Sequence, residues 1–333
     1  MIWIKTEEEN VTVTGFYLQI IGRAFDRLNQ QVTYTSKLND IKPKSGDTVV
    51  FCTAPCVRSF LRRDIRVIYW AQGVWPEESF MRHSGKMRFF LTGAVERTAL
   101  KRADFVFFVS DHMRAHFEKK YKLSFGDNYY VMPCSNDSLH AEAFEGDDKY
   151  RNKVFCYAGA TSVWQCFEET IALYSKIEQS VKDTKLLLLV KNKELAEKII
   201  EKYQVKNYEI DYVSVDQLPD RLKGVKYGFL LRKPSVVNAV ATPTKTLTYI
   251  SSGVIPVYSN CLHGISEIFS GCNYKIEVRE GNELDAILKK INEPVNNKEI
   301  LEEYRHIYHK YYDEDAHIER IMTKFKKLGF LQD

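Results

Sequence analysis

The chain has 333 residues, of which 44% are hydrophobic and 28% charged, a composition typical of a globular protein rather than a disordered one. This length allows two ordinary domains, each with its own core. No apolar run in the sequence approaches the ~18 residues that a membrane-spanning helix needs. The first residues lack the pattern of a signal peptide, and seven cysteines without a repeated spacing favour a reducing compartment. We therefore expect a cytoplasmic protein.

The first half of the chain predicts short apolar strands that alternate with helices. Residues 1–5 are strand-like, and residues 15–31 have the apolar spacing of a helix. Further strands are expected at 48–52, 66–70, 105–110 and 128–133, and helices at 90–103 and 110–121. Strands that are apolar throughout and alternate with helices indicate a parallel sheet covered on both faces.

A polar and acidic stretch, residues 135–153, is the expected linker to a second domain. A second alternating series follows it, with strands expected at 154–159, 185–190, 208–213, 227–232 and 254–259 and helices near 167–177 and at 193–203. The last segment, residues 313–330, is amphipathic. The sequence thus predicts an α/β protein with two doubly wound Rossmann-like domains, residues 1–145 and 150–310, that face each other across a cleft. We expect the C-terminal helix, residues 311–333, to return to the first domain.

Positive charge is concentrated between residues 57 and 102. This region holds ten Lys or Arg against four acidic residues, an excess of six, whereas the whole chain has a net charge of +4. Apolar Phe89, Phe90 and Leu91 lie inside it. Such a surface suits an anionic membrane or a phosphorylated acceptor, and a solvated helix face remains the alternative. Nucleic acid is not an expected partner, because no recognised motif accompanies the charge.

Open parallel sheets bind ligands beyond the carboxyl ends of their strands, so the loops after the strands are the first candidates for a site. The loop after residues 66–70 carries Gln72, Gly73, Trp75 and Glu77. An aromatic face next to hydrogen-bonding groups suits a sugar, and we predict that these four residues bind the acceptor. The alternatives are a packing role for Trp75 and a role for Glu77 in the first turn of a helix.

The loop that opens the second domain is a weaker candidate for binding phosphate. Gly159 allows close approach of the backbone, and Thr161 or Ser162 can cap the following helix, whose first amides would face the ligand. The full glycine-rich pattern of a dinucleotide site is missing. Trp164 can equally pack in the core.

Residues 230–260 contain three cations with no acidic residue between them. Arg232 and Lys233 end a strand, and Lys245 lies in the first turn of a helix that Thr242 can cap, with Pro243 at its first position. Cations at a helix N-terminus are unfavourable by ~0.3–1 kcal/mol each, unless an anion is bound there. We therefore predict a diphosphate site, and the alternative is that both lysines extend into solvent. No metal site is expected, because the histidine pair four residues apart on a predicted helix lacks a third ligand.

Several segments together resemble GT-B glycosyltransferases, most closely family 4 and its bacterial polysaccharide-synthesis branch. They are ALKRADFVFFVSDHM and YYVMPCSND before the linker, YAGATSVWQ after it, and the Leu-Leu-Arg…Val-Asn…Pro-Thr-Lys…Tyr…Gly-Val-Ile-Pro-Val series of residues 230–257. The resemblance implies transfer of a sugar from a nucleotide-sugar to a hydroxyl of a glycan or lipid-linked acceptor. It also implies retention of configuration and a reaction that usually needs no metal, and no other cofactor is expected. Together with the basic region between residues 57 and 102, it predicts a cytoplasmic enzyme at the inner face of a membrane.

The resemblance places the nucleotide on the C-terminal domain and the acceptor on the N-terminal domain. Arg232 and Lys245 would be the catalytic residues, because they would stabilise the leaving diphosphate. The donor-binding residues implied or predicted are Gly159, Thr161, Ser162, Trp164, Lys233, Asn238, Thr244 and Thr248. The chain departs from the family at Val240 and Thr248, where typical members have two glutamates, the second of which holds the ribose.

Two other functions remain open at this point. The first is a nucleotide-sugar epimerase, which can share the architecture but needs acidic and basic side chains that the loops do not gather. The second is a non-catalytic partner of an active glycosyltransferase, which the missing glutamates favour and the cations of residues 230–260 oppose.

Overall fold

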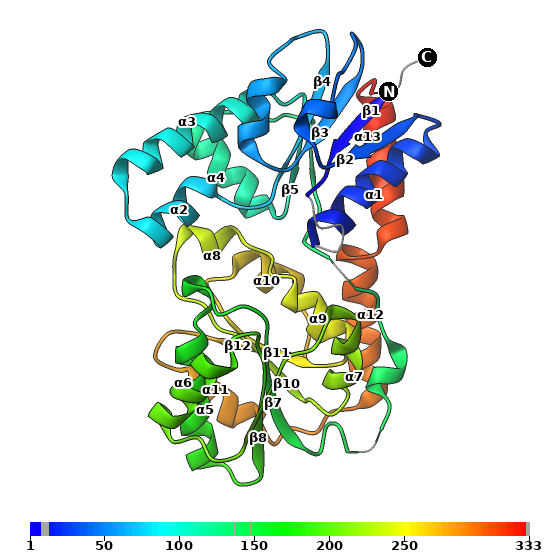
Figure 1. The fold of residues 1–333 in the computed structure, drawn as a ribbon. Coiled ribbons are helices and arrows are strands. Elements are labelled where there is room, and N and C mark those ends of the chain that lie inside the picture. The colour runs from blue at the N-terminus through cyan, green and yellow to red at the C-terminus, as the bar shows by residue number, and fades with distance from the viewer. Residues whose placement is uncertain (8–12, 136, 147, 331–333) are drawn as a thin grey trace. The chain divides into compact units, whose positions relative to one another are not determined.

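The computed structural model describes residues 1–7, 13–135, 137–146 and 148–330, and the chain divides into two units (Figure 1). The first unit comprises Met1–Asn136, Val240–Thr242 and Lys310–Asp333, and the second comprises Asp137–Ala239 and Pro243–His309. Each unit is built around a six-stranded sheet in which neighbouring strands of the described residues are parallel. The predicted α/β class with two Rossmann-like sheets is therefore confirmed.

The sheet of the first unit has the strand order β2-β1-β3-β4-β5-β6. Its strands are β1 (Ile2–Lys5), β2 (Val32–Thr35), β3 (Thr48–Phe51), β4 (Arg66–Ala71), β5 (Phe105–Phe108) and β6 (Tyr129–Val131). Its helices are α1 (Val13–Arg27), α2 (Trp75–His83), α3 (Lys86–Arg102), α4 (Asp111–Tyr121) and α13 (Glu314–Lys327). All residues of β3 and β5 are buried, because helices cover both faces of the sheet.

The C-terminal helix α13 lies beside α1 and completes the core of the first unit (Figure 1). The ring of Phe325 stacks on Phe25 with 4.6 Å between centroids, and meets Phe105 edge-on at 5.3 Å. Buried His317 accepts a hydrogen bond at Nδ1 from the Tyr130 hydroxyl (2.8 Å) and donates one from Nε2 to the Tyr311 carbonyl (2.9 Å). The apolar face of α13 is therefore buried in the core of the first unit, where it makes aromatic contacts.

The sheet of the second unit has the order β12-β11-β10-β7-β8-β9. Its strands are β7 (Lys153–Ala158), β8 (Thr184–Leu189), β9 (Tyr208–Asp211), β10 (Tyr227–Leu230), β11 (Ile255–Ser259) and β12 (Ile276–Val278). The principal helices are α5 (Phe167–Ser180), α6 (Lys193–Tyr203), α7 (Leu218–Leu222), α8 (Val236–Val240), α9 (Lys245–Ser251), α10 (His263–Ile268), α11 (Glu283–Lys290) and α12 (Asn297–Tyr311). Figure 1 shows α5, α6 and α11 on one face of this sheet and α7, α9 and α12 on the other.

The order of strands in the second unit reverses between β7 and β10. Strands β8 and β9 extend the sheet on one side of β7, and β10, β11 and β12 extend it on the other. In doubly wound sheets, the crevice at the carboxyl ends of such a strand pair is where ligands bind. The residues that follow β7 and β10 are therefore the best-placed candidates for a site.

Helix α9 begins at Lys245, two residues later than the sequence predicted. Thr242 does not cap it, because its Oγ1 donates to the Val109 carbonyl and accepts from the Cys134 amide, both at 3.3 Å. Thr244 precedes the helix and makes no side-chain capping bond. Within the described ranges, no helix is long and apolar enough to cross a membrane.

Candidate functional site

Gly159 follows β7 and Lys245 opens α9, and the structure brings the two residues together. A Cβ atom on Gly159 would lie 2.6 Å from Lys245 Cε, and the glycine φ angle of +121° disfavours other residues as well. The Lys245 ammonium lies 3.9 Å from the centroid of the Tyr157 ring and donates to Gln165 Oε1 at 2.5 Å. Gly159 therefore makes room for a lysine side chain that crosses the end of β7.

Arg232 follows β10 and reaches the same loop from the other side. It is only 8% exposed, and its Nη1 donates to the backbone carbonyls of Gln165 (3.2 Å) and Leu231 (2.7 Å). Its backbone amide donates to Ser259 Oγ at 2.9 Å, which fixes the end of the strand. The two predicted catalytic cations thus lie at the strand pair where the topology places a ligand crevice.

Neither cation has a negative partner in the described part of the chain, because no carboxylate there forms an ion pair with Arg232 or Lys245. The Lys245 side chain is partly exposed to solvent, but its ammonium packs against Tyr157. Burial, together with the charge of Arg232, lowers the pKa of Lys245 well below its ordinary value. Burial also lowers the pKa of Arg232. An anion bound here would relieve both effects, because it would stabilise the charged forms.

Lys233 differs from the other two cations, because it forms an ion pair with Glu169 of α5. Both side chains are largely exposed. With Arg232 they line a pocket of about 310 Å³ at the ends of β10 and β11, whose rim also carries Glu280 and Glu283. Glu169 therefore balances the charge of Lys233, although no acidic residue occurs between residues 230 and 260.

Two predicted donor-binding residues use their side chains inside the protein. Asn238 is 2% exposed, and its Nδ2 donates to the Lys233 carbonyl at 2.9 Å. Thr248 is 6% exposed, and its Oγ1 donates to the Thr244 carbonyl at 3.4 Å. These bonds support the loop before α8 and the first turn of α9.

Thr244, another predicted donor-binding residue, directly precedes α9. Three more lie on the loop that joins β7 to α5. Thr161, Ser162 and Trp164 are half-buried there, and Ser162 makes no capping hydrogen bond from its side chain.

Gln165 on the same loop was not among the predicted site residues, although it lies in the YAGATSVWQ segment. The position of Gln165 shortly after β7 could have indicated a site residue. The sequence does not reveal that Arg232 and Lys245 both donate hydrogen bonds to it.

A second pocket, of about 460 Å³, lies at the carboxyl ends of β3 and β4 in the first unit. Its lining includes Gln72, Gly73 and Trp75, three of the four predicted acceptor-binding residues, together with Glu78. A Cβ atom on Gly73 would lie 2.0 Å from Glu78 Oε1, so the glycine admits that carboxylate. Burial raises the pKa of Glu78, and Gln72 Nε2 is buried with no oxygen or nitrogen acceptor in the described part of the chain.

The fourth predicted acceptor-binding residue, Glu77, is engaged elsewhere. Its carboxylate bonds to Lys120 Nζ at 2.8 Å and to His116 Nε2 at 3.2 Å, both on α4. Burial raises the pKa of Glu77, but these hydrogen bonds prevail and the pKa is lowered overall. Lys120 also meets Glu96, a fully buried carboxylate that accepts from the Trp75 amide. Glu77 therefore links α2 to α4, and Glu78, not Glu77, lines the pocket.

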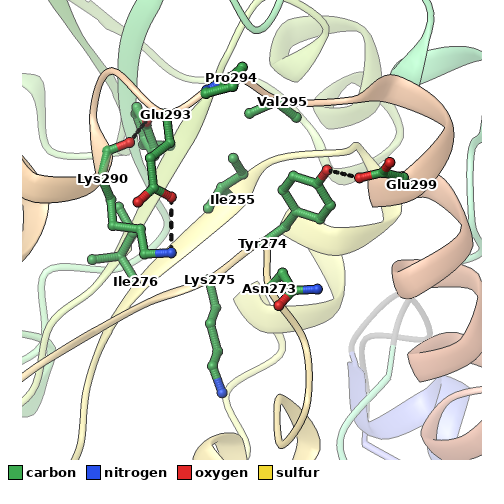
Figure 2. A pocket seen from close by; sticks show the side chains of 11 residues that line it. Ile255, Asn273, Tyr274, Lys275, Ile276, Lys290, Glu293, Pro294, Val295 and Glu299 are labelled. Carbon is green, nitrogen blue, oxygen red and sulfur yellow. Dashed lines mark hydrogen bonds and ion pairs between the residues drawn. The ribbon is translucent and has the colours of Figure 1, made fainter.

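A third pocket, of about 330 Å³, lies at the opposite, amino ends of β10, β11 and β12. Figure 2 shows the Lys290–Glu293 ion pair (3.0 Å) and the hydrogen bond from the Tyr274 hydroxyl to Glu299 (2.8 Å) around it. Its charges are thus balanced locally, and the edge of the sheet is the one that ligands of doubly wound folds avoid. No three His, Cys, Asp or Glu residues gather as a metal site in the ranges that the structure describes.

Comparison with known proteins identifies the fold. No protein-family model and no curated protein sequence matches the chain. Among solved structures, sucrose-phosphate synthase from Thermosynechococcus elongatus is similar over 98% of both chains, with a TM-score of 0.74 and 11% identity. WaaG, a glycosyltransferase of lipopolysaccharide biosynthesis, is similar over 97% of this chain and 98% of its own, with a TM-score of 0.61 and 13% identity.

S. aureus TarM, solved in complex with UDP and α-GlcNAc-glycerol, is similar over 94% of this chain with a TM-score of 0.64 and 11% identity. The chain spans 59% of the length of TarM. These likenesses show that the chain has the GT-B fold that the sequence predicted. Membership of family 4 stays a prediction.

Proposed function

We propose that the chain is a glycosyltransferase that moves a sugar from a nucleotide-sugar to an acceptor hydroxyl in polysaccharide or glycan synthesis. The observation that carries this proposal is the pair of inward-facing cations, Arg232 and Lys245, without a carboxylate partner among the described residues at the β7–β10 switch point. A nucleoside diphosphate supplies the missing charge. The GT-B fold supports the same reading, as does the UDP that is bound in TarM.

The two cations have a clear role in such a reaction. When the bond between the sugar and the diphosphate breaks, negative charge grows on the leaving phosphate oxygen. Arg232 can donate two hydrogen bonds to it, and Lys245 approaches over the Tyr157 ring. Both groups are already oriented, and removal of one such donor typically lowers the rate by ~10²–10³-fold. The same leaving phosphate can take the acceptor proton, which gives retention of configuration without a metal ion.

We assign the acceptor to the pocket of the first unit. Trp75 offers an aromatic face there, and Gln72 and Glu78 offer an amide donor and a carboxylate acceptor for sugar hydroxyls. Gly73 is needed because it admits Glu78. Glu77 has a supporting role through α4.

The acceptor is proposed to be lipid-linked and reached at the inner face of a membrane, because the α2–α3 hairpin exposes apolar and cationic side chains together. Met87, Phe90 and Leu91 are 78%, 72% and 63% exposed. Three exposed cations of the same hairpin flank them: Arg82, Lys86 and Arg88. Apolar groups that enter the lipid and cations that meet its headgroups are the two elements of interfacial binding.

Co-sedimentation with phosphatidylcholine vesicles, with and without phosphatidylglycerol, tests the membrane proposal. We expect binding to increase with the anionic lipid and to be lost in the Phe90→Ser/Leu91→Ser double variant. Val215→Ser is the matched control, since Val215 is 55% exposed on the second unit. Binding that ignores the anionic lipid, or that the double variant retains, removes this part of the proposal.

Incubation with a panel of nucleotide-sugars tests the enzymatic proposal. We expect one member of the panel to release its nucleoside diphosphate slowly without an acceptor. A non-catalytic partner protein is the second candidate, because Asn238 and Thr248 use their polar groups within the fold. Diphosphate binding without release from any donor would favour that candidate. A protein that shows neither diphosphate binding nor release would contradict the enzymatic proposal.

A further inference from the structure

Gln165 lies where the two inward-facing cations meet. Its Oε1 accepts hydrogen bonds from Lys245 Nζ (2.5 Å) and from the Tyr157 hydroxyl (3.2 Å). Its backbone carbonyl accepts from Arg232 Nη1 (3.2 Å). The ammonium can only donate, so the side-chain atom that faces it is the amide oxygen. One neutral residue therefore serves both cations at the carboxyl end of β7.

A neutral acceptor is a poor match for two cations that repel each other. Hydrogen bonds in which both partners are charged are roughly twice as strong as neutral ones. A phosphoryl oxygen would therefore displace Gln165 Oε1 from Lys245. We propose that Gln165 is a positioning residue whose amide oxygen holds the place of a phosphoryl oxygen in the empty site and yields it when the diphosphate binds. This inference rests on the proposed function.

The chemistry of the amide makes the exchange simple. A rotation about the last bond of the Gln165 side chain replaces Oε1 by the Nε2 donor, which can then bond to the incoming phosphate. The same side chain thus accepts from Lys245 in the empty site and donates to the ligand in the occupied one. Tyr157 keeps a partner throughout, because its hydroxyl also donates to the Ala160 carbonyl at 2.6 Å.

Gln165→Glu is the sharpest test, because it puts a permanent carboxylate of the same shape between the cations. Isothermal titration with inorganic pyrophosphate should show an affinity about 10–100-fold lower than that of the wild type, the factor that one charge-assisted hydrogen bond represents. The melting temperature of the free variant should rise. Gln165→Ala removes both the competing acceptor and the Nε2 donor to the ligand, so it should lower the melting temperature and weaken pyrophosphate binding less than Gln165→Glu does.

A second readout separates this role from simple support of the loop. The rate at which acetic anhydride labels Lys245, followed by peptide mass spectrometry across a pH series, reports the pKa of its amine. Gln165→Glu should raise that pKa, and Gln179→Glu, the same charge change at an exposed position of α5, should not. A pKa that stays unchanged in Gln165→Glu would contradict the contact between this side chain and the Lys245 ammonium.

The outcomes are distinguishable. If wild-type protein binds pyrophosphate and Gln165→Glu binds it equally well, the inference fails and the proposed function stands. The inference also fails if Gln165→Ala loses as much affinity as Gln165→Glu. If wild-type protein binds neither pyrophosphate nor any nucleoside diphosphate, both the inference and the proposed function fail.

Discussion

Protonation of His317 should weaken the first unit at mildly acidic pH. Burial lowers the pKa of this residue from 6.5 to about 4, and the neighbouring Arg320 acts in the same direction. The neutral ring is fully used, because it accepts from the Tyr130 hydroxyl and donates to the Tyr311 carbonyl. A second proton would lie on the nitrogen that faces Tyr130, in a site with little access to water.

The size of the effect follows from the two pKa values. Between pH 6.5 and 4 the imidazole binds a proton in the unfolded chain but not in the folded one, so the free energy of unfolding falls as the pH falls. Each unit of pKa difference corresponds to ~1.4 kcal/mol, which gives about 3 kcal/mol in total. The loss should be complete near pH 4.

Urea titrations of wild-type protein and of His317→Gln at pH 7 and pH 4 measure this contribution. Glutamine can accept from Tyr130 and donate to Tyr311, but it does not titrate. Other acidic groups affect both proteins equally, so the variant should gain about 3 kcal/mol relative to the wild type on acidification. A difference between the two proteins that does not change with pH would refute the reasoning.

Two further predictions concern the second unit. Burial lowers the pKa of Lys149 from 10.5 to about 7, so the unfolded state binds more protons between these values and the free energy of unfolding should rise with pH from 7 to 10.5. Lys149→Met should reduce that slope in urea titrations. Gly159→Ala should lower stability by ~1–3 kcal/mol through its backbone alone and also weaken pyrophosphate binding, because the new Cβ displaces Lys245. Gly271→Ala is the matched control, since Gly271 also has a positive φ (+80°) but open space around it, and it should leave binding unchanged. Equal binding by both glycine variants would contradict the placement of Lys245.

Much of the fold could be predicted because buried parallel strands have a strong signal. Segments such as residues 185–190 are apolar at nearly every position, and turns and helices separate them regularly. The strands β2 and β12 were missed for the opposite reason: β2 is half-exposed at the sheet edge, and β12 has only three residues, one of them Glu277. The start of α9 was misplaced because Thr242, a good capping residue by type, is held by tertiary hydrogen bonds instead.

The candidate site was predictable where topology alone fixes position. Gly159 and Arg232 end adjacent strands of an α/β series, so their proximity follows from the strand order. Glu77 and Glu78 could not be told apart, because one residue along a helix turns a side chain by about 100° and only packing decides which one meets the pocket. The role of Gln165 depends on three contacts from residues 8, 67 and 80 positions away, which the sequence does not encode locally.

The central claim is that Arg232 and Lys245 form a diphosphate site at the β7–β10 switch point. Isothermal titration of the wild type, Arg232→Ala and Arg221→Ala with a panel of nucleoside diphosphates tests it most directly. Arg221 is the matched control, because it lies on α7 and pairs with Glu209 and Asp211. We expect the wild type and Arg221→Ala to bind one of the diphosphates with similar affinity and Arg232→Ala to lose most of that binding. Unchanged affinity in Arg232→Ala would contradict the claim.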